Sequence, residues 1–513
     1  MLAAELVRRG ARRYANRVAV VVGDREMTYA EVDERANRLA NVFLSLGYGA
    51  GRPRQRVGLL ADNGVWSVPL EFACLKAGVA RVPLNARLSV TEQARMLNET
   101  DVRLLVHSEE LTDRAHELVL RCEGLRLAGL GVRERADDVN LIAEADAASA
   151  TDPAVLLAPD DRTVVLFTSG TSGTLKAAQH TQASISAITA NILANLVDPG
   201  RDSAMLHAAS LVHASGTFLL PYWLRGGRAV VLPGFDPERY LDVIDDQRIT
   251  TVNLVPTMLG LLFSSGALDD PKRASSLDTI IYGASPMPRP MLERGLERFG
   301  PRFVQYYGQT EAPLCQTVLD KVDHTDPTLL GSCGHPAVDA EIVIADEQGD
   351  PVPPGEIGEL RVRAPFAMAG YFNAPELNAQ TITPGGWIRT RDMARADDRG
   401  YVHLVDRASD MIITGGYNVY PREVEDALSV HPAVAECAVV GAPDPTWVEA
   451  VTAFVSLRPG ASVTDEELLG SVRDRLAGYK VPKRIEIVEE IPKSPVGKIL
   501  RRALREPLWR DQP

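Results

Sequence analysis

The sequence predicts an α/β protein in which a large, multi-layer N-terminal domain with a small β subdomain precedes a small α+β C-terminal domain. Three observations support this prediction. At 513 residues the chain is too long for one hydrophobic core. Apolar runs of strand length alternate with helical spacing over roughly the first 330 residues, which is typical of layered folds with mostly parallel sheets. The pattern then changes near residue 330 and again near residue 409.

The alternation begins with a helix after Thr28-Tyr29, whose apolar face is formed by residues of helical spacing. These residues are Val32, Ala36, Leu39 and Phe43. A second helix is expected over 68–77, and the acidic, alanine-rich stretch 109–160 is expected to be a surface region. The expected strands are 56–61, 103–107, 164–167, 229–232, 251–255 and 279–282.

The later parts of the chain have shorter elements. Short strands separated by Gly and Pro turns indicate a small β subdomain, and they are expected over 341–345, 358–363 and 400–404. Farther on, Pro421 begins a helix and the capping box Thr464-x-x-Glu467 precedes another. Residues 438–440 and 484–491 predict strands of the same unit. We therefore expect domains over 1–408 and 409–513, with the boundary at Ser409.

One stretch predicts a phosphate site. The apolar run 164–167 leads into seven Thr, Ser and Gly residues and then to Lys176, and helical spacing follows over 185–192. We expect strand, loop and helix in that order. Glycines let backbone N–H groups face a phosphate, hydroxyls add donors, and the lysine adds charge. The nucleotide loop G-x-x-x-x-G-K-[ST] does not fit, because Gly173 is too far from the lysine and Ala177 follows it. The residues expected to bind phosphate are Thr168, Ser169, Gly170, Thr171, Ser172, Gly173 and Lys176.

Composition excludes several classes of function. A net charge of −13 argues against general nucleic-acid binding, which needs a basic face. No apolar run approaches the roughly 20 residues that span a bilayer. Arg8 and Arg9 follow the first apolar residues, which is the reverse of a secretory signal. The five cysteines show no metal-ligand spacing, so we expect free thiols in a reducing cytoplasm.

The phosphate loop resembles the signature of the adenylate-forming superfamily, which includes acyl-CoA synthetases, luciferases and peptide-synthetase adenylation domains. Six further motifs resemble those of the superfamily, in the same order along nearly the whole chain. They lie at 211–216, 282–287, 306–311, 386–392, 407–421 and 492–501. One such match has little weight, but six in register indicate membership.

The resemblance implies sites for ATP and Mg²⁺. The phosphate loop would hold the β- and γ-phosphates, Glu311 would ligate Mg²⁺, and Thr310 would contact the α-phosphate. Tyr307 would stack on adenine and Asp392 would bind the ribose hydroxyls, while Arg407 would either join Asp392 there or reach a phosphate. The backbone segments expected beside the nucleotide contain Gly283, Ala284, Ser285 and Gly308.

The resemblance also implies residues for the acid and for coenzyme A. Lys498 would bridge the substrate carboxylate and the α-phosphate, and His213 matches the histidine that lines the acyl pocket. The small domain would be mobile and turn about Ser409, presenting first Lys498 and then a coenzyme A face. The residues expected on that face are Gly415 and Gly416 beside the pantetheine arm, with Trp447, Tyr479, Lys480 and Lys483 near the nucleotide end.

The resemblance thus implies an AMP-forming acyl-CoA synthetase that uses ATP, Mg²⁺ and coenzyme A to activate a carboxylic acid through an acyl-adenylate. Low aromatic content and a neutral pocket segment favour a hydrophobic aryl, alicyclic or fatty acid. A peptide-synthetase module is disfavoured, because His213 stands where amino-acid-activating domains usually carry an aspartate. A homodimer is left open. From a different class, a non-catalytic acyl or nucleotide sensor on the same fold is the alternative.

Several positions depart from the superfamily pattern. They are Leu175, Ala177, Gln182, Arg391, Ser409 and Tyr417. Arg391 replaces a glycine beside Asp392, and an Arg–Asp pair would compete with the ribose for that carboxylate. These departures motivate a second hypothesis, in which the protein adenylates poorly and mainly transfers to coenzyme A an acyl-adenylate made by a partner enzyme in a specialised pathway.

Overall fold

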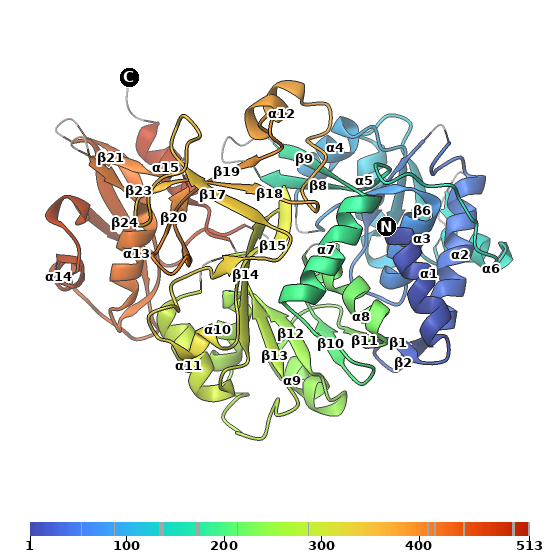
Figure 1. The fold of residues 1–513 in the computed structure, drawn as a ribbon, viewed down its shortest axis with the longest axis horizontal. Coiled ribbons are helices and arrows are strands. Elements are labelled where there is room, and N and C mark those ends of the chain that lie inside the picture. Colours follow the sequence, from blue (N-terminus) through green and yellow to red (C-terminus); the bar gives the residue numbers. More distant parts are fainter. Residues whose placement is uncertain are drawn as a thin grey trace.

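The computed structural model describes residues 1–52, 54–86, 88–132, 138–169, 175–212, 214–285, 287–407, 410–414, 417–444, 447–473, 475–494 and 498–510. For Thr168, Ser169, Leu175, Asp406 and Arg407 only the backbone is described. Figure 1 shows the chain passing from N-terminal layers on the right to a small C-terminal part on the left. No helix among the described residues is long and apolar enough to cross a membrane.

Two large sheets form most of the structure, and both have parallel central strands (Figure 1). The strands of the seven-stranded sheet, in spatial order, are β7 (Val139–Asn140), β6 (Arg126–Gly129), β5 (Leu104–His107), β3 (Arg56–Leu60), β4 (Ala80–Pro83), β8 (Arg162–Ser169) and β9 (Leu175–Thr181). Those of the nine-stranded sheet are β16 (His335–Pro336), β15 (Ala312–Leu319), β14 (Phe303–Gln309), β13 (Thr279–Tyr282), β12 (Thr251–Leu254), β10 (Ala204–His207), β11 (Arg228–Val231), β1 (Val18–Val22) and β2 (Arg25–Thr28). The nine-stranded sheet has antiparallel strands at both edges, whereas the seven-stranded sheet has one antiparallel edge, at β9, and one parallel edge, at β7.

Helices cover both faces of these sheets and complete the predicted layers. Between the sheets, one core joins strands of both with α1 (Ala3–Tyr14), α2 (Tyr29–Ser45), α3 (Ser67–Ala77) and α8 (Leu219–Arg225). The outer layers are α4 (Val90–Glu99) and α5 (Thr112–Val119) on one side, and α9 (Pro237–Asp246), α10 (Pro256–Ser264) and α11 (Arg289–Phe299) on the other. The remaining helices of this part are α6 (Leu141–Ala147), α7 (Gln182–Asn195) and α12 (Pro375–Thr381). The expected helix after Thr28 is confirmed as α2, with a complete capping box and its predicted apolar face buried.

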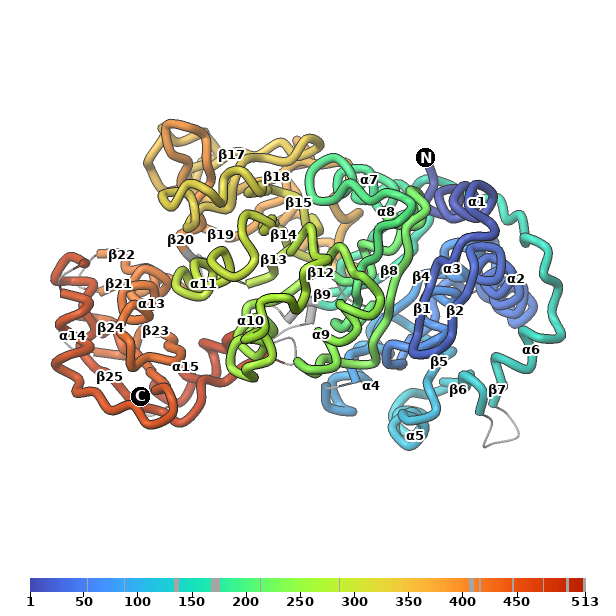
Figure 2. Tube along the Cα trace, turned by 90° about the horizontal axis from the view of Figure 1, so that it is seen from below, coloured from blue at the N-terminus to red at the C-terminus, as the bar shows by residue number. Residues whose placement is uncertain are grey.

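The predicted β subdomain is a four-stranded antiparallel sheet, and the C-terminal α+β unit is a five-stranded sheet with helices. The subdomain contains β17 (Glu341–Ala345), β18 (Gly358–Arg363), β19 (Ile388–Ala396) and β20 (Val402–Arg407). The C-terminal sheet contains β22 (Tyr417–Val419), β21 (Ile412–Thr414), β24 (Val448–Leu457), β23 (Val434–Asp444) and β25 (Arg484–Ile487). Its helices are α13 (Pro421–Ser429), α14 (Asp465–Arg473) and α15 (Arg501–Trp509). In Figure 2 this unit forms one end of the molecule.

Two expectations about these elements were wrong. The stretch 109–160 is not simply a surface region, because it contributes two strands and two helices and buries Leu118, Leu127 and Leu141. The phosphate loop does not lead directly into a helix, because β9 intervenes and pairs antiparallel with β8. Lys176 therefore lies on a strand, opposite Thr168.

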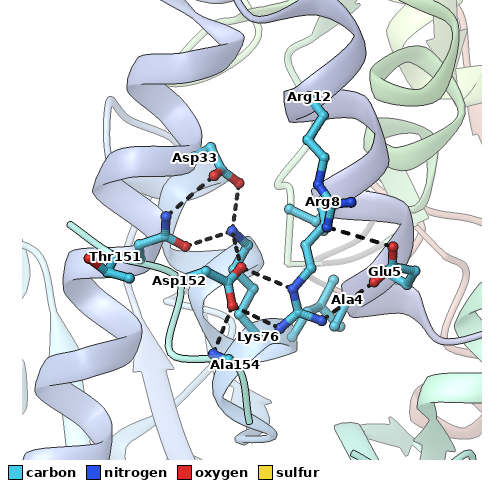
Figure 3. Close-up of polar contacts among 12 residues, drawn as sticks. Ala4, Glu5, Arg8, Arg12, Asp33, Lys76, Thr151, Asp152 and Ala154 are labelled. Carbon is cyan, nitrogen blue, oxygen red and sulfur yellow. Dashed lines mark hydrogen bonds and ion pairs between the residues drawn. The ribbon is translucent and has the colours of Figure 1, made fainter. Parts of the chain in front are cut away.

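A fully buried lysine joins three helices to the segment that leads into β8 (Figure 3). The ammonium of Lys76 on α3 donates to Asp33 Oδ1 and Asn37 Oδ1 of α2, both at 2.6 Å. It lies 3.2 Å from Asp152 Oδ2, and Arg8 of α1 donates to the same carboxylate at 2.9 and 3.1 Å. Because an unpaired buried charge is very unfavourable, this network fixes the helices and the segment around Asp152 relative to one another.

Lys76→Met should lower the free energy of unfolding by about 3 kcal/mol, because it removes the cation that binds Asp33 and one of the two cations that bind Asp152. Burial alone would raise the pKa of Asp152, but hydrogen bonds from Arg8 and the Ala154 N–H, with the charge of Lys76, lower it. The stabilisation is therefore complete above the unfolded carboxyl pKa of about 3.9 and is lost as the pH falls below it. Urea denaturation at pH 7 measures the loss. Arg12→Ala, at a side chain 73% exposed, is the control and should change stability by less than about 0.5 kcal/mol.

Candidate active site

The centre of the candidate site is the turn between β14 and β15, which consists of Thr310 and Glu311. The two strands approach very closely at Gly308, where a Cβ would lie 2.2 Å from the carbonyl oxygen of Leu314. A glycine is therefore required for β15 to fold back at this point. The turn places Thr310 and Glu311, the residues predicted to contact the α-phosphate and Mg²⁺, where β14 and β15 of the nine-stranded sheet meet.

The antiparallel strands β8 and β9 of the seven-stranded sheet, which flank the predicted phosphate loop, lie against this turn and are called the phosphate hairpin below. His180 of β9 is 1% exposed, and its Nε2 lies 2.8 Å from the carbonyl oxygen of Thr310, so Nε2 carries the proton and donates. Burial lowers the pKa of His180 to about 4, which keeps the ring neutral near pH 7. Lys176 of the same strand lies on the same side, with its ammonium 5.8 Å from the ring centroid of Tyr371.

Tyr371 is a site residue that sequence reasoning missed. It lies in the segment 368–372, which is found between β18 and α12 in the sequence. This segment runs along β9, where Ala178 is the bridge partner of Tyr371. Its hydroxyl donates to Glu311 Oε1 at 2.5 Å. The sequence signal was weak, because Gly370-Tyr371 indicates no more than a turn.

A second cluster surrounds Asp392 on β19. Its carboxylate Oδ2 accepts hydrogen bonds from the Tyr307 hydroxyl at 2.5 Å and from Gln309 Nε2 at 2.9 Å. Burial, followed by the negative charge of Asp392, raises the pKa of Tyr307 well above its usual value, so the phenol stays protonated. Tyr307 and Asp392 thus lie together, whereas the stacking of Tyr307 on adenine and the binding of ribose by Asp392 stay predictions. Gln309 is the second donor, and its role was not anticipated from the motif.

The segment of Gly283, Ala284 and Ser285 follows β13, the neighbour of β14. A Cβ at Gly283 would lie 2.5 Å from the carbonyl oxygen of Tyr306, so the two chains touch here. Ala284 has a left-handed φ of +66°. This segment therefore lies beside the strand that carries Tyr307, and its contact with the nucleotide stays a prediction.

Arg391 does not pair with Asp392. The strand alternates, so Arg391 is exposed whereas Asp392 is only 7% exposed. Arg391 has a φ of +62°, a conformation that favours glycine. Burial and the negative charge of Glu311 raise the pKa of Tyr371, and the positive charge of Arg391 acts in the opposite direction.

The C-terminal candidates form separate groups. Lys498 is exposed at the base of a hairpin in which Lys493 and Ile499 are bridged, and its backbone bonds to Ser494 at 2.7 and 3.1 Å. The ring of Tyr479 stacks on Tyr417, with centroids 4.7 Å apart.

The two lysines expected on coenzyme A phosphate have different surroundings. Lys480 Nζ donates to Glu423 at 2.6 Å, so this ammonium is already neutralised. Lys483 Nζ lies over the ring of Trp447, 4.9 Å from its centroid. Among the described contacts of Lys483 there is no carboxylate, which leaves its charge available to an anion.

Some predicted residues lie outside the described part of the chain. They are Gly170, Thr171, Ser172, Gly173, His213, Ser409, Gly415 and Gly416, and the side chains of Thr168, Ser169 and Arg407. The described residues contain no cluster of three or more His, Cys, Asp or Glu that could hold a metal alone. Glu311 fits Mg²⁺ in another way, because this ion commonly binds one or two carboxylates together with substrate phosphates.

Comparison with known proteins defines the class. The model of the AMP-binding enzyme family matches residues 7–372, and that of the AMP-binding enzyme C-terminal domain matches residues 423–498. The chain therefore belongs to this family of adenylate-forming enzymes. The resemblance found in the motifs and the predicted fold class are both confirmed.

Individual relatives are named for joining acids to acceptors. The chain is 36% identical to the medium/long-chain-fatty-acid–CoA ligase FadD8 of Mycobacterium tuberculosis, over 97% of this chain and 88% of that protein. It is 38% identical to a feruloyl-CoA synthase of an Amycolatopsis species, over 97% of each. The solved structure of the amide bond synthetase McbA from Marinactinospora thermotolerans superposes with a TM-score of 0.90, at 33% identity, over 98% of this chain and 99% of that one.

Arg391→Gly should stabilise the protein by about 0.5–1 kcal/mol. Relief of the left-handed backbone contributes about 1–2 kcal/mol, and the greater freedom of glycine in the unfolded chain offsets part of it. Arg395→Gly is the matched control, since Arg395 is exposed on the same strand without a positive φ, and it should destabilise by about 0.5–1 kcal/mol. Urea denaturation of both variants measures the difference, and the same sign for both would contradict the strain.

Proposed function

We propose that this enzyme is an AMP-forming acyl-CoA synthetase that activates a hydrophobic carboxylic acid with ATP and transfers the acyl group to coenzyme A. One observation carries the proposal. Lys176, Glu311 and Asp392, from three different sheets, gather around the β14–β15 turn with Tyr371 and Tyr307 between them. A lysine for phosphate oxygens, a carboxylate for Mg²⁺ and a carboxylate for ribose hydroxyls together suit a nucleoside triphosphate.

In the first half-reaction, a carboxylate oxygen of the acid attacks the α-phosphorus of ATP. The new acyl–phosphate bond forms as the bond to the β-phosphate breaks, and pyrophosphate leaves with the electron pair. Lys176 and the loop before it hold the β- and γ-phosphates, and Asp392 binds the ribose. Glu311 would hold Mg²⁺, which offsets phosphate charge when bound.

Lys498 bridges the attacking carboxylate and the α-phosphate as negative charge builds up between them. In the second half-reaction the thiolate of coenzyme A attacks the acyl carbonyl, a C–S bond forms, and AMP leaves. We assign the large domain to 1–408 and the small one to 409–513, turning at Ser409 between the two steps. The proximity of Lys176, Glu311 and Asp392 supports the expectation that this chain adenylates its own substrate. All five cysteines are free and buried, which fits a reducing cytoplasm.

The acid is proposed to be a fatty or aryl acid, as the two CoA-ligase relatives above take. An assay with a panel of acids, reading pyrophosphate release and acyl-CoA formation separately, tests this. Two tubes then separate full activity from transfer alone: acid, ATP, Mg²⁺ and CoA in one, and synthetic acyl-adenylate with CoA in the other. Product in the second tube alone would overturn the proposal in favour of the transfer hypothesis.

Lys498→Ala should lower adenylation on the order of a hundredfold or more, because an electrostatic group aimed at developing charge is removed. Transfer to CoA from a supplied acyl-adenylate should remain. Lys493→Ala is the matched control, since Lys493 lies in the same hairpin and its ammonium binds Glu436 at 2.6 Å. Equal losses in both half-reactions would count against this role of Lys498.

A second candidate function is amide bond formation from the same acyl-adenylate. The observation that favours it lies on the small domain, where Lys480 is bound to Glu423 and the Tyr479 ring is stacked on Tyr417. These contacts occupy residues expected to bind CoA, and one structural neighbour is named an amide bond synthetase. Amide product with simple amines, without thioester when CoA is present, would establish it.

If CoA is the acceptor, Lys483→Ala should raise its KM on the order of tenfold and leave pyrophosphate release unchanged. The reason is that Lys483 keeps a charge for phosphate, whereas Lys480 is already neutralised by Glu423. Lys480→Ala should therefore change the KM less than Lys483→Ala. Steady-state kinetics with varied CoA measures both, and the reverse order would show that phosphate displaces Glu423.

A further inference from the structure

Tyr371 lies between the two charged residues expected to handle the triphosphate and its metal ion. Its hydroxyl donates to Glu311 Oε1 at 2.5 Å, and its ring centroid is 5.8 Å from the Lys176 ammonium. Glu311 belongs to the nine-stranded sheet and Lys176 to the seven-stranded sheet, so a single side chain contacts one charge from each.

We propose that Tyr371 is a positioning residue of adenylation, which presents the Glu311 carboxylate to Mg²⁺ through its hydroxyl and seats the Lys176 ammonium through its ring. The inference rests on the proposed function, because it concerns the same triphosphate site.

The hydroxyl determines how Glu311 can bind a metal. Among the described residues, Tyr371 is the single donor to this carboxylate, and Oε2 has no protein partner. A carboxylate held by one oxygen offers the other as a ligand from a fixed direction. Mg²⁺ demands near-ideal geometry and binds through few protein ligands. If Glu311 is already fixed, less side-chain entropy is lost when the ion binds.

The backbone of Tyr371 is held from two sides. On one side, the N–H of Phe372 donates to Ala177 and that of Gln179 to Gly370, at 2.8 and 3.0 Å along β9. On the other side, Asn378 of α12 accepts from the Tyr371 N–H at 2.6 Å and donates to its carbonyl at 3.0 Å. With 4% of its surface exposed, Tyr371 has little freedom, which is what a positioning residue needs.

The phenol keeps its proton in this environment. Burial, and after it the charge and hydrogen bond of Glu311, raise the pKa of Tyr371 well above its usual value. A carboxylate has only acceptor atoms, so the Tyr371 hydroxyl is the donor of its hydrogen bond with Glu311.

Two substitutions separate the roles of hydroxyl and ring. Tyr371→Phe removes the bond to Glu311 and keeps the ring beneath Lys176, whereas Tyr371→Leu removes both. Tyr401→Phe is the matched control, because Tyr401 is also buried and donates to a carboxylate, Asp323 Oδ1 at 2.7 Å, in the small hydrophobic cluster of Leu319 and Leu329. ATP binding is measured by calorimetry over a range of free Mg²⁺, and acid-dependent pyrophosphate release is measured in parallel.

For Tyr371→Phe, the Mg²⁺ concentration that gives half-maximal ATP affinity should rise on the order of tenfold, with near wild-type affinity at saturating Mg²⁺. Tyr371→Leu should in addition bind ATP about three- to tenfold more weakly at saturating Mg²⁺. Tyr401→Phe should leave the Mg²⁺ dependence unchanged. A Mg²⁺ dependence of Tyr371→Phe equal to that of Tyr401→Phe would overturn the proposal, even if Tyr371→Leu fails to fold.

The same measurements distinguish this inference from the proposed function. If the Mg²⁺ dependence of ATP binding shifts in Tyr371→Phe but no acid gives pyrophosphate release, the positioning role of Tyr371 is supported and the proposed synthetase activity is overturned. Wild-type protein that binds no ATP with Mg²⁺ would overturn both.

Discussion

The candidate site depends on one short segment, 368–372, which is bonded to two sheets at once. Its backbone pairs with β9 through Ala369, Gly370 and Phe372, and the N–H of Met368 donates to the Glu311 carbonyl at 2.7 Å. The phosphate hairpin and the β14–β15 turn are therefore held in one position relative to each other by main-chain hydrogen bonds. Side chains such as Tyr371 and His180 add polar contacts at the same junction.

The other end of the hairpin is fixed by buried polar groups. Gln182, which follows β9, is fully buried; its amide accepts from the Ala4 N–H and donates to the Leu75 carbonyl, both at 2.9 Å. This explains a departure from the superfamily pattern, because a residue here joins α1 to α3 and has no need to contact substrate. The Lys76 network fixes the chain just before β8 in the same way (Figure 3). The chain before β8 and the chain after β9 are thus both fixed by buried polar or charged groups, which are costly to leave unpaired.

Much of the fold followed from the sequence, because strands such as 279–282 are continuous apolar runs bounded by turn residues. The strand β9 was missed because Lys176, Ala177 and Ala178 have no β-branched side chain, and its partners supply the stabilisation. Two helices in 109–160 were missed because their buried faces use few large residues.

The residues of the candidate site likewise include some that sequence motifs identify and others whose position depends on the fold. Glu311, Asp392 and Lys176 could be predicted because motifs fix their chemical type and order. Tyr371 could not be predicted, since its role arises from pairing between segments nearly 200 residues apart, such as Ala178 with Tyr371. The face to which Arg391 points also required the strand register, because one step along a strand reverses the side-chain direction.

The residues proposed to bind coenzyme A are held by side-chain contacts, whereas those proposed to bind ATP are held by main-chain bonds. The free energies of these contacts can be compared. The ion pair of Lys480 with Glu423 joins side chains that are 19% and 31% exposed, so its net contribution is about 1 kcal/mol. Trp447 is 40% exposed, and the cation–π contact of Lys483 with its ring contributes a similar free energy. A phosphate group of coenzyme A would reach Lys483 without displacing a carboxylate but would have to compete with Glu423 for Lys480, whereas an amine acceptor needs neither cation. On the proposed function, the choice of acceptor would therefore rest on a few contacts of about 1 kcal/mol each, while the residues proposed for ATP are held by main-chain bonds between sheets. Such a division lets the acceptor change by a few substitutions without disturbing adenylation, in keeping with relatives of one fold that are named CoA ligases and an amide bond synthetase.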